Sequence, residues 1–362
     1  MCAPCALSNL PLIRSVLPIY RNIVDNHTGQ AMAVLGAGSW GMAIARHLDR
    51  LGHCVRLWEF DPKAAQLLSE TRLLPDKLPG IHLPDRVLVT NDLREAVDGS
   101  DALVFVTPST VLRASAARVA ALGSSERLIV SLAKGIDVQT GDRMTQILSA
   151  ELGVKGPVAL VGPSHAEEVA RDVPTALVAA SELEDAAIRT QELFTSEKLR
   201  VYTSDDPVGV ELGAALKNIV AIAAGIIDGL GYDSSDNMKG ALVTRGLAEI
   251  TRLGVKMGAR AETFAGLSGV GDLVTTCLSK HSRNRHVGEQ VGRGKRLDEV
   301  LSGMAMVAEG VTTTQAALRL AEKHDVDMPI ARAVGAVLFD NMPAAEALSQ
   351  LMARPTQPEI RR

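Results

Sequence analysis

The stretch that decides the fold is residues 32–61, MAVLGAGSWGMAIARHLDRLGHCVRLWEFD. It predicts a short apolar strand at 33–35, a glycine-rich turn at 36–41, a helix that begins directly after the turn, and a second strand at 54–58. A strand, a G-x-G-x-x-G turn and a helix in this order are typical of a dinucleotide-binding site. The phosphates of a dinucleotide would then sit at the helix N-terminus.

Each glycine of the turn has a separate expected purpose. Gly36 allows the tight turn, Gly38 leaves room for a pyrophosphate, and Gly41 lets the helix pack closely. Glu59 follows the second strand, 23 positions after Gly36, where a carboxylate takes the ribose hydroxyls of NAD and repels the extra phosphate of NADP. The alternative is a glycine turn with only a structural purpose, but the flanking strands, helix and acid all favour the cofactor site.

Composition indicates a water-soluble protein of about two domains. The chain has 362 residues, of which 46% are hydrophobic and 22% charged, and its net charge is −4. This charge and an aromatic content of 3% argue against a nucleic-acid or acidic-membrane partner. The four cysteines show no metal-binding spacing, so we expect no metal and reduced cytoplasmic thiols. The longest apolar run, residues 219–227, is too short to span a bilayer, so no integral membrane segment is expected.

Beyond residue 62, apolar runs alternate with helical segments, which predicts an α/β fold with a doubly wound, Rossmann-like parallel sheet. The expected strands are Val87–Val89, Ala102–Val106, Leu128–Leu132, Val158–Val161, Ala176–Val178 and Leu199–Tyr202. Ligands collect at the carboxyl ends of such strands. Three of these ends carry residues 107–109 (TPS), 133–135 (AKG) and 162–164 (GPS).

The pattern changes after Asp206 and Pro207, an N-cap and N1 pair that opens a helix running toward Gly229. Helices alone are expected from there to about residue 353. We therefore predict a dinucleotide-binding domain over 31–208 and an all-helical substrate and catalytic domain over 209–353. Residues 1–30 are expected to be a mobile or mistranslated leader, with Met32 as a plausible start, and residues 354–362 a disordered tail.

Lys217 is the leading catalytic candidate. Its neighbours one helical turn away are Gly213, Ala214, Val220 and Ala221, so the ammonium leaves a face of small apolar residues. A lysine in such a helix is costly unless it is paired or functional. The alternative is that it reaches solvent at the helix surface.

Three further motifs each allow a functional and a structural interpretation. Lys134, directly after a buried strand, is either a substrate-binding cation or a solvated loop lysine. Asp272, after a glycine pair, is either a helix N-cap or the partner of a buried lysine. Ser282, Arg283 and Asn284 begin a helix and could clamp a phosphate, or form a solvated basic turn in which Asn284 is a simple cap.

Taken together, the motifs resemble the NAD(P)-dependent glycerol-3-phosphate dehydrogenases. The resemblance rests on GAGSWG (36–41), AKG (133–135), GPSHA (162–166), LKN (216–218), TRGLAEI (244–250), GVGDLVTTC (269–277), SRNR (282–285) and AEG (308–310). It runs in order from about Met32 to Met352. It implies reversible hydride transfer between NAD(P)H and dihydroxyacetone phosphate, giving sn-glycerol 3-phosphate for glycerophospholipid synthesis in the cytoplasm, by a protein that forms a homodimer.

The resemblance also assigns residues. It implies that Lys217 is the acid/base group and that Asp272 supports it. The implied substrate contacts are Lys134, Gly162, Ser164, Lys217, Asp272, Ser282, Arg283 and Asn284. The implied cofactor contacts, beside Gly36, Gly38, Gly41 and Glu59, are Ser39, Trp40, Phe60, Lys134, Ala166, Arg283, Val307 and Glu309.

Three positions depart from the family pattern. Phe60 stands where many members have a His or Arg that meets the NADP phosphate, so NAD is favoured over NADP. Thr110 replaces a histidine, and Ser164 replaces a threonine while keeping the hydroxyl. Two other functions remain open at this point: a dehydrogenase for another β-hydroxyacid-type substrate, and a non-catalytic NAD-binding sensor.

Overall fold

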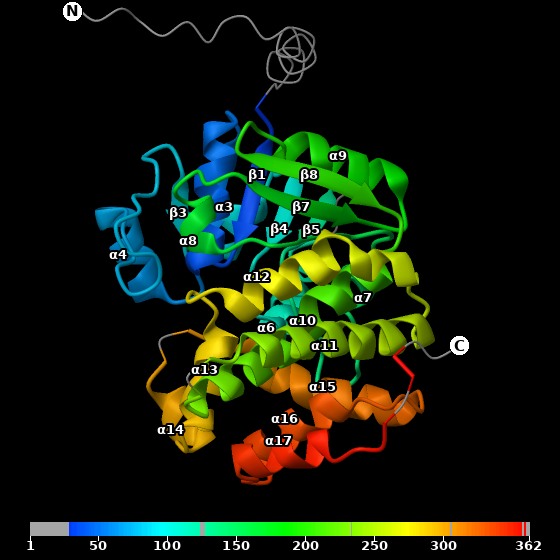
Figure 1. Cartoon of the computed structure of the whole chain (residues 1–362). Helices are drawn as coiled ribbons and strands as arrows, with labels where there is room; N and C mark the ends of the chain where they lie inside the picture. The colour runs from blue at the N-terminus through cyan, green and yellow to red at the C-terminus, as the bar shows by residue number, and fades with distance from the viewer. Residues whose placement is uncertain (1–28, 124–126, 233, 305, 357, 360–362) are drawn as a thin grey trace, which may run out of the picture.

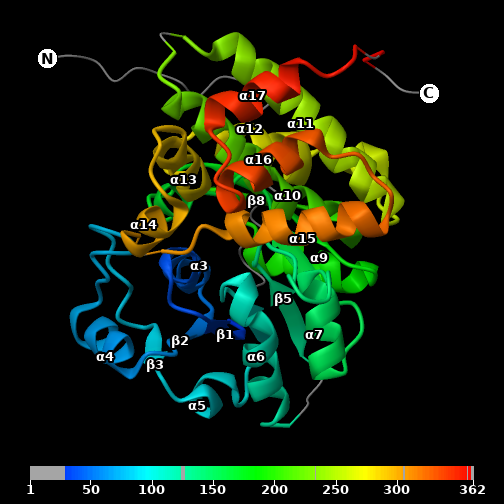
Figure 2. The same ribbon diagram turned by 90° about the horizontal axis from the view of Figure 1, so that it is seen from below.

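The computed structural model describes residues 29–359 apart from 124–126, 233, 305 and 357. Residues 1–28 of the expected leader lie outside the described residues, as do residues 357 and 360–362 of the tail. An eight-stranded sheet occupies the first half of the chain, and the second half is helical (Figures 1 and 2). The predicted fold class, a Rossmann-like domain followed by helices, is confirmed.

The sheet has the strand order β3-β2-β1-β4-β5-β6-β7-β8. Its strands are β1 (Ala31–Leu35), β2 (Cys54–Trp58), β3 (Leu88–Thr90), β4 (Ala102–Phe105), β5 (Leu128–Ser131), β6 (Val158–Val161), β7 (Thr175–Ala180) and β8 (Leu199–Ser204). The order reverses between β1 and β4, and at such a point the strand ends leave a crevice for a ligand.

The expectation of a wholly parallel sheet is wrong at one place. Strands β6 and β7 pair antiparallel, with Leu160 opposite Ala179, whereas β7 and β8 pair parallel. The connection from β6 to β7 holds only the one-turn helix α8 (Ala166–Val169). Because a parallel crossover needs a longer connection, usually with a full helix, the chain returns in the opposite direction.

Helices cover both faces of the sheet. One face packs against α3 (Ser39–Arg50), α8 and α9 (Glu184–Phe194), and the other against α5 (Leu93–Val97), α6 (Ser109–Ala120) and α7 (Met144–Leu152). Helix α4 (Pro62–Thr71) lies near the β3 edge. Successive residues of β1 pack on opposite faces of the sheet. Val34 belongs to the core cluster with α3, α8 and α9, and Leu35 to the cluster with α5, α6 and α7, as expected for a strand covered on both faces.

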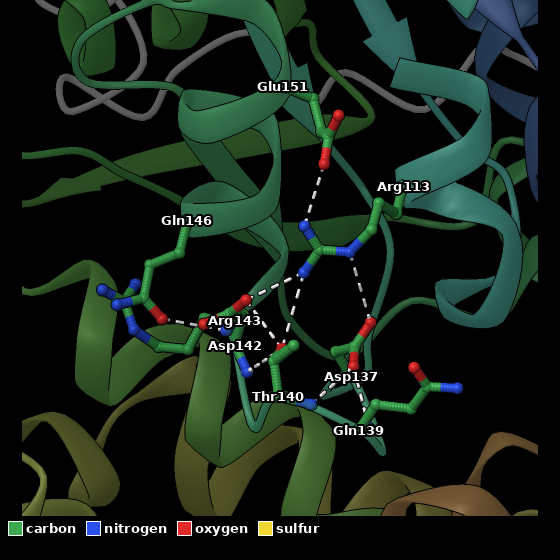
Figure 3. A network of polar contacts seen from close by, with 8 residues as sticks. All are labelled: Arg113, Asp137, Gln139, Thr140, Asp142, Arg143, Gln146 and Glu151. Carbon is green, nitrogen blue, oxygen red and sulfur yellow. Dashed lines mark hydrogen bonds and ion pairs between the residues drawn. The ribbon is translucent and has the colours of Figure 1, made fainter. Parts of the chain in front are cut away.

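A network of polar contacts fixes α6 to α7 (Figure 3). The Arg113 guanidinium on α6 contacts Glu151 of α7 at 2.9 Å and Asp142 at 2.8 Å, and Asp137 lies 3.7 Å away. These contacts raise the pKa of Arg113, chiefly through its hydrogen bond to Glu151. The network holds one side of α6 in place, which matters because another side of this helix borders the cleft described below.

Helix α10 is the centre of the second half. It spans Pro207–Gly229, with the Asp206 side chain accepting a hydrogen bond from Gly209 N, as the predicted N-cap requires. By length and composition it could cross a membrane, but 94% of its most apolar window is buried within the protein. Its first half packs on β6 and β7 through Val210 and Ala214, so the helix joins the sheet to the helical part.

Most of the other helices pack directly on α10, whereas two of them, α14 and α17, pack on α13 and α16 (Figure 2). These helices are α11 (Asp236–Lys256), η1 (Ala261–Ala265), η2 (Leu267–Gly271), α12 (Asp272–Leu278), α13 (Arg283–Gly292), α14 (Leu297–Ser302), α15 (Glu309–Lys323), α16 (Pro329–Phe339) and α17 (Ala344–Met352). A Cβ at Gly225 of α10 would lie 1.9 Å from Arg285 O, and one at Gly288 of α13 would lie 2.0 Å from Ile222 O. Only glycine permits this approach, which brings the first half of α13 beside the later part of α10.

A buried ion pair ties α10 to the sheet domain. The Glu211 carboxylate of α10 contacts the Arg143 guanidinium and accepts hydrogen bonds from Thr145 N at 2.8 Å and Thr145 Oγ1 at 2.6 Å. Every one of these groups is buried. Because the carboxylate has several donors, the pair holds α10 in register over the sheet, and with it the residues one to two turns further along the helix.

Candidate active site

A cleft of about 620 Å³ lies between the strand ends and the helices α10, α12 and α13. Its lining includes the glycine turn, Glu59, Phe60, Lys134, Ser164, Lys217, Asp272 and the start of α13. Of the catalytic, substrate-binding and cofactor-binding residues predicted from the sequence, Gly41 and Gly162 do not line the cleft. Gly41 instead packs against Gly36 within the turn, and the Gly162 carbonyl oxygen accepts a hydrogen bond from Lys134 Nζ.

The glycine turn has the geometry of a phosphate cradle. Gly36 has a φ of +115°, in the region that favours glycine, and a Cβ at Gly41 would lie 1.8 Å from Gly36 O. A Cβ at Gly38 would meet no atom within 4 Å, so the space in front of the turn is open. Helix α3 begins here and points its free backbone N–H groups at this space.

Three side-chain polar atoms in the cleft are buried and lack partners among the described residues. They are Trp40 Nε1, Thr107 Oγ1 and His165 Nε2. All three residues line the cleft, the first beside the glycine turn, the second after β4 and the third after β6. A buried donor or acceptor left unpaired is costly, so these atoms fit a site that a polar ligand completes. The residues present thus fit a dinucleotide.

The far end of the cleft, beside β2, combines an acid with aromatic rings. Glu59 is buried, accepts a hydrogen bond from Asp61 N at 3.2 Å, and lies 3.6 Å from Lys77 Nζ. Phe60 is 69% exposed and packs edge-on against Trp58, with ring centroids 6.2 Å apart. The sequence did not single out Lys77.

The opposite end holds three charged groups in contact. Lys217 Nζ lies 2.9 Å from Asp272 Oδ1, and Lys134 Nζ lies 3.0 Å from Asp272 Oδ2. One carboxylate therefore joins an ammonium from α10 to an ammonium from the loop after β5. Lys217 is only 4% exposed, so it does not reach solvent at the helix surface. The solvated-loop interpretation of Lys134 is also wrong, because its Nζ donates to Gly162 O at 2.7 Å.

Asp272 is not the cap of its helix. It is the first residue of α12, Gly271 takes the cap position, and the carboxylate faces the two lysines instead. Thr276, one turn later on the same face, accepts a hydrogen bond from Lys217 Nζ and donates to Asp272 O at 2.7 Å. Thr276 was not predicted from the sequence, although its spacing of four residues from Asp272 was a signal for it.

Burial and charge set the pKa values of this cluster. Burial lowers the pKa of Lys217 to about 8, an effect that Asp272 opposes and Lys134 reinforces. Burial alone would raise the pKa of Asp272, but the Lys134 and Lys217 ammonium groups outweigh it, so the pKa lies below its ordinary value. Asp272 therefore stays ionised while Lys217 can gain or lose a proton near neutral pH.

The start of α13 presents polar donors to the cleft. Ser282 is the helix N-cap and accepts a hydrogen bond from Arg285 N at 3.2 Å. Asn284 is not the cap, since its Oδ1 accepts from Gly310 N at 2.8 Å, which leaves its amide N–H groups available. Arg283 is exposed and has no ion pair within the described part of the chain. These groups together suit a phosphate.

Three further residues close the cleft. Glu309 accepts a hydrogen bond from Ser109 N at 3.0 Å and so connects α15 to the start of α6. Val307 is half-exposed at the rim, and Ala166 is buried at the start of α8. Among the residues that the structure describes, no three His, Cys, Asp or Glu side chains are grouped to hold a metal ion.

The chain is similar to known proteins over most of its length. Residues 31–187 match the model of the NAD-dependent glycerol-3-phosphate dehydrogenase N-terminus, and residues 206–349 match that of the C-terminus. The glycerol-3-phosphate dehydrogenase [NAD(P)+] of Prosthecochloris aestuarii is 47% identical over 91% of this chain and 99% of its own. A second such enzyme, from Salinibacter ruber, is 49% identical over 91% of this chain and 96% of its own. The crystal structure of glycerol-3-phosphate dehydrogenase from Coxiella burnetii superposes with a TM-score of 0.86 at 34% identity, covering 90% of this chain and 99% of that one.

Proposed function

Because this chain belongs to the NAD-dependent glycerol-3-phosphate dehydrogenase family, we propose specific roles for its cleft residues in that reaction. The chain is an oxidoreductase that transfers a hydride between NAD(P)H and dihydroxyacetone phosphate, giving sn-glycerol 3-phosphate. The observation that carries the proposed roles is the Lys217–Asp272–Lys134 cluster, which shares one cleft with the glycine turn and the start of α13.

Lys217 is the acid/base residue in this proposal. When bound, NADH supplies the hydride to the substrate carbonyl carbon, and negative charge develops on the carbonyl oxygen. The Lys217 ammonium donates a proton from Nζ to that oxygen, and in the reverse direction neutral Nζ takes the proton from the hydroxyl. A pKa of about 8 suits both directions near neutral pH, because neither protonation state is rare.

Asp272 and Lys134 position the acid/base group. The Asp272 carboxylate holds both ammonium groups, at 2.9 and 3.0 Å, so that neither turns away from the cleft. Lys134 is held further by Gly162 O, and its Nζ lies 3.3 Å from Ser164 Oγ. With Lys217 it keeps the cleft positive where the oxygen charge develops.

The start of α13 binds the substrate phosphate. Arg283 supplies a forked donor, Asn284 its amide N–H groups, and Ser282 its hydroxyl, at a helix N-terminus that favours an anion. Gripping the phosphate fixes the orientation of the carbonyl at the other end of a three-carbon molecule. The proposed cofactor contacts are Gly36, Gly38, Ser39, Trp40, Glu59, Phe60, Lys134, Ala166, Arg283, Val307 and Glu309, and Gly41 contributes by its close packing against Gly36 in the turn.

NAD is the favoured cofactor in this proposal. Glu59 places a buried carboxylate at the cleft wall, where it suits ribose hydroxyls, and Phe60 offers no charge to an additional phosphate. Lys77, at 3.6 Å, offsets part of the Glu59 charge, so NADPH is expected to be used but not preferred.

We also propose domain boundaries, a cellular location and an oligomeric state for the enzyme. We assign residues 31–208 to the dinucleotide domain and 209–353 to the substrate domain, in keeping with the separate core clusters of the sheet and of the helices around α10. We further propose a cytoplasmic homodimer that supplies glycerol 3-phosphate for phospholipid synthesis. Sedimentation distinguishes a dimer from the 38.3 kDa monomer.

Steady-state kinetics test the proposed roles. We expect NADH oxidation with dihydroxyacetone phosphate, with kcat/KM for NADH at least equal to that for NADPH. Unphosphorylated dihydroxyacetone should be reduced at least about 100-fold less efficiently, because it cannot engage α13. Arg283→Ala should narrow that difference when NADH is saturating, because it lowers kcat/KM for dihydroxyacetone phosphate and removes no contact from the unphosphorylated ketone. A strong NADPH preference would overturn the cofactor assignment, and activity confined to an unphosphorylated ketoacid would overturn the substrate roles.

A further inference from the structure

Arg118 occupies an unassigned position at the cofactor end of the cleft. It lies in the last turn of α6, and its Cζ is 5.2 Å from the centroid of the Trp58 ring and 5.4 Å from that of Phe60. The residue is exposed and lines the cleft. No hydrogen bond or ion pair holds its guanidinium within residues 29–359 as described. Its place is set by the two aromatic rings.

Arg118 is the last of four residues on the face of α6 that borders the cleft. Val111, Ala114, Ser115 and Arg118 all line the cleft and follow the spacing of one helical face. The Arg113 network fixes another side of the same helix to α7. The face of α6 that borders the cleft is therefore a rigid wall, apolar near the strand ends and carrying a guanidinium at its outer end.

The two sides of β2 separate Arg118 from Glu59. Trp58 packs in the core cluster that contains Leu112 and Ala116 of α6. Glu59, the next residue, instead reaches Lys77 at 3.6 Å, in the loop that packs against the other face of the sheet through Leu74 and Leu78. A ribose that contacts Glu59 would therefore direct its 2′ position away from Arg118, and the base attached to it would lie toward α6.

We propose that Arg118, held against the Trp58 and Phe60 rings, stacks on one face of the adenine ring of the dinucleotide. This inference rests on the proposed function, in that the cleft must take NAD(P) in the orientation that places the ribose at Glu59. A guanidinium is flat and stacks on π faces, and a purine presents such a face whichever group the ribose carries. Arg118 thus binds the part that NADH and NADPH share, and it does not select between them.

The two tryptophans of the chain allow a direct binding measurement. Trp40 and Trp58 are its only tryptophans, and both line the cleft. Quenching of their fluorescence gives dissociation constants from the titration midpoint, which does not depend on how Arg118 itself affects the Trp58 signal. We expect Arg118→Ala to weaken NADH, NADPH and ADP by a similar factor of about tenfold, within the range for loss of one base-stacking partner.

Two readouts locate the effect at the adenine. Reduced nicotinamide mononucleotide lacks the adenine-bearing half of the dinucleotide. Its kcat/KM as hydride donor should therefore be the same for wild type and Arg118→Ala. The variant's kcat at saturating NADH should stay within about twofold of wild type, because Arg118 is distant from the Lys217 cluster. Arg118→Lys keeps the charge but loses the flat face, so we expect it to bind almost as weakly as the alanine variant.

A matched control removes the same kind of contact elsewhere. Arg200 lies 5.1 Å over the Tyr202 ring on β8, at the far edge of the sheet and outside the cleft lining. Arg200→Ala should leave every dissociation constant unchanged.

Three results would overturn the proposed stacking of Arg118 on the adenine. These are a loss confined to NADPH, which would make Arg118 a reader of the 2′-phosphate; unchanged binding in Arg118→Ala; and wild-type affinity in Arg118→Lys. Failure of the proposed function itself would appear separately, as wild-type protein that binds dinucleotide without reducing dihydroxyacetone phosphate.

Discussion

Two cavities of similar size border the central helix, and only one has the properties of an active site. The cleft has a volume of about 620 Å³ and contains Lys217, from the middle of α10. The second cavity, of about 550 Å³, is bordered by the later part of α10 together with α11, α16 and α17, and it contains Glu249. Volume does not distinguish these two sites.

A displaced pKa does not distinguish them either. Burial lowers the pKa of Lys217 to about 8, and burial raises that of Glu249 to about 7. Because both groups are buried, each has a pKa displaced toward neutral pH. Perturbed pKa values are common at functional sites, but structural groups show them too.

Glu249 and Lys217 differ in the hydrogen bonds they make and in the groups that surround them. Glu249 accepts hydrogen bonds from Ile330 N at 2.8 Å and Ala331 N at 3.3 Å, so both carboxylate oxygens serve the N-terminus of α16. The rest of that cavity is mainly apolar. Lys217 instead shares its cavity with a second ammonium, an open glycine turn and unpaired polar atoms at Trp40 and Thr107. Convergent groups with unused bonding capacity mark the functional cavity.

Removing the Lys217 amine should give the largest difference between the cavities. We expect Lys217→Ala to lower kcat for dihydroxyacetone phosphate reduction by about 1,000-fold, within the range for loss of a general acid. NADH binding, measured by tryptophan fluorescence, should change little. Lys239→Ala is the matched control, because Lys239 also pairs with an aspartate, Asp228, but outside the cleft. Turnover by Lys217→Ala equal to wild type would instead support a non-catalytic NAD-binding sensor.

The pH dependence should be opposite for the two directions of the reaction. Reduction needs protonated Lys217, so kcat/KM for dihydroxyacetone phosphate should fall as the pH rises above about 8, approaching tenfold per pH unit. Oxidation of glycerol 3-phosphate needs the neutral amine, so its kcat/KM should fall as the pH drops below about 8. Profiles between pH 6.5 and 10 test this. Profiles that bend in the same sense in both directions would exclude Lys217 as the titrating group.

The fold was largely predictable because its signals are local. The turn at Gly36, the buried strands and the Asp206 cap of α10 each depend on a few neighbouring residues, and the structure confirms them. The antiparallel β7 was not predictable from its own sequence. An apolar run does not show which way a strand is paired, and only the short α8 connection carries that information.

The site was predictable as residue types but not as contacts. Lys217 and Asp272 are 55 positions apart, and no local pattern states that their side chains meet at 2.9 Å. Asn284 looked like a cap because caps are local, whereas its partner Gly310 belongs to another helix. Arg118 gave no signal, since its significance comes from aromatic rings on a different strand.

The smallest expected effect concerns Glu249 and appears in stability alone. Burial raises its folded-state pKa to about 7, although the backbone N–H groups of Ile330 and Ala331 act in the opposite sense. Between its ordinary pKa of 4.5 and about 7, the folded protein therefore holds a proton on Glu249 that the unfolded chain has released. It follows that Glu249 makes the free energy of unfolding fall as the pH rises from 4.5 to 7, by at most about 3 kcal/mol.

Glu249→Gln removes this titration and so should flatten the pH dependence of stability. The free energy of unfolding of wild type minus that of the variant should be larger at pH 5 than at pH 7.5. We expect this change to be about 1 kcal/mol or more, as measured from urea midpoints. The kcat of the variant should equal that of wild type at both pH values, because Glu249 supports α16 and does not touch the cleft. If the substitution lowered kcat instead, the apolar cavity would be coupled to catalysis, and the distinction drawn between the two buried groups would fail.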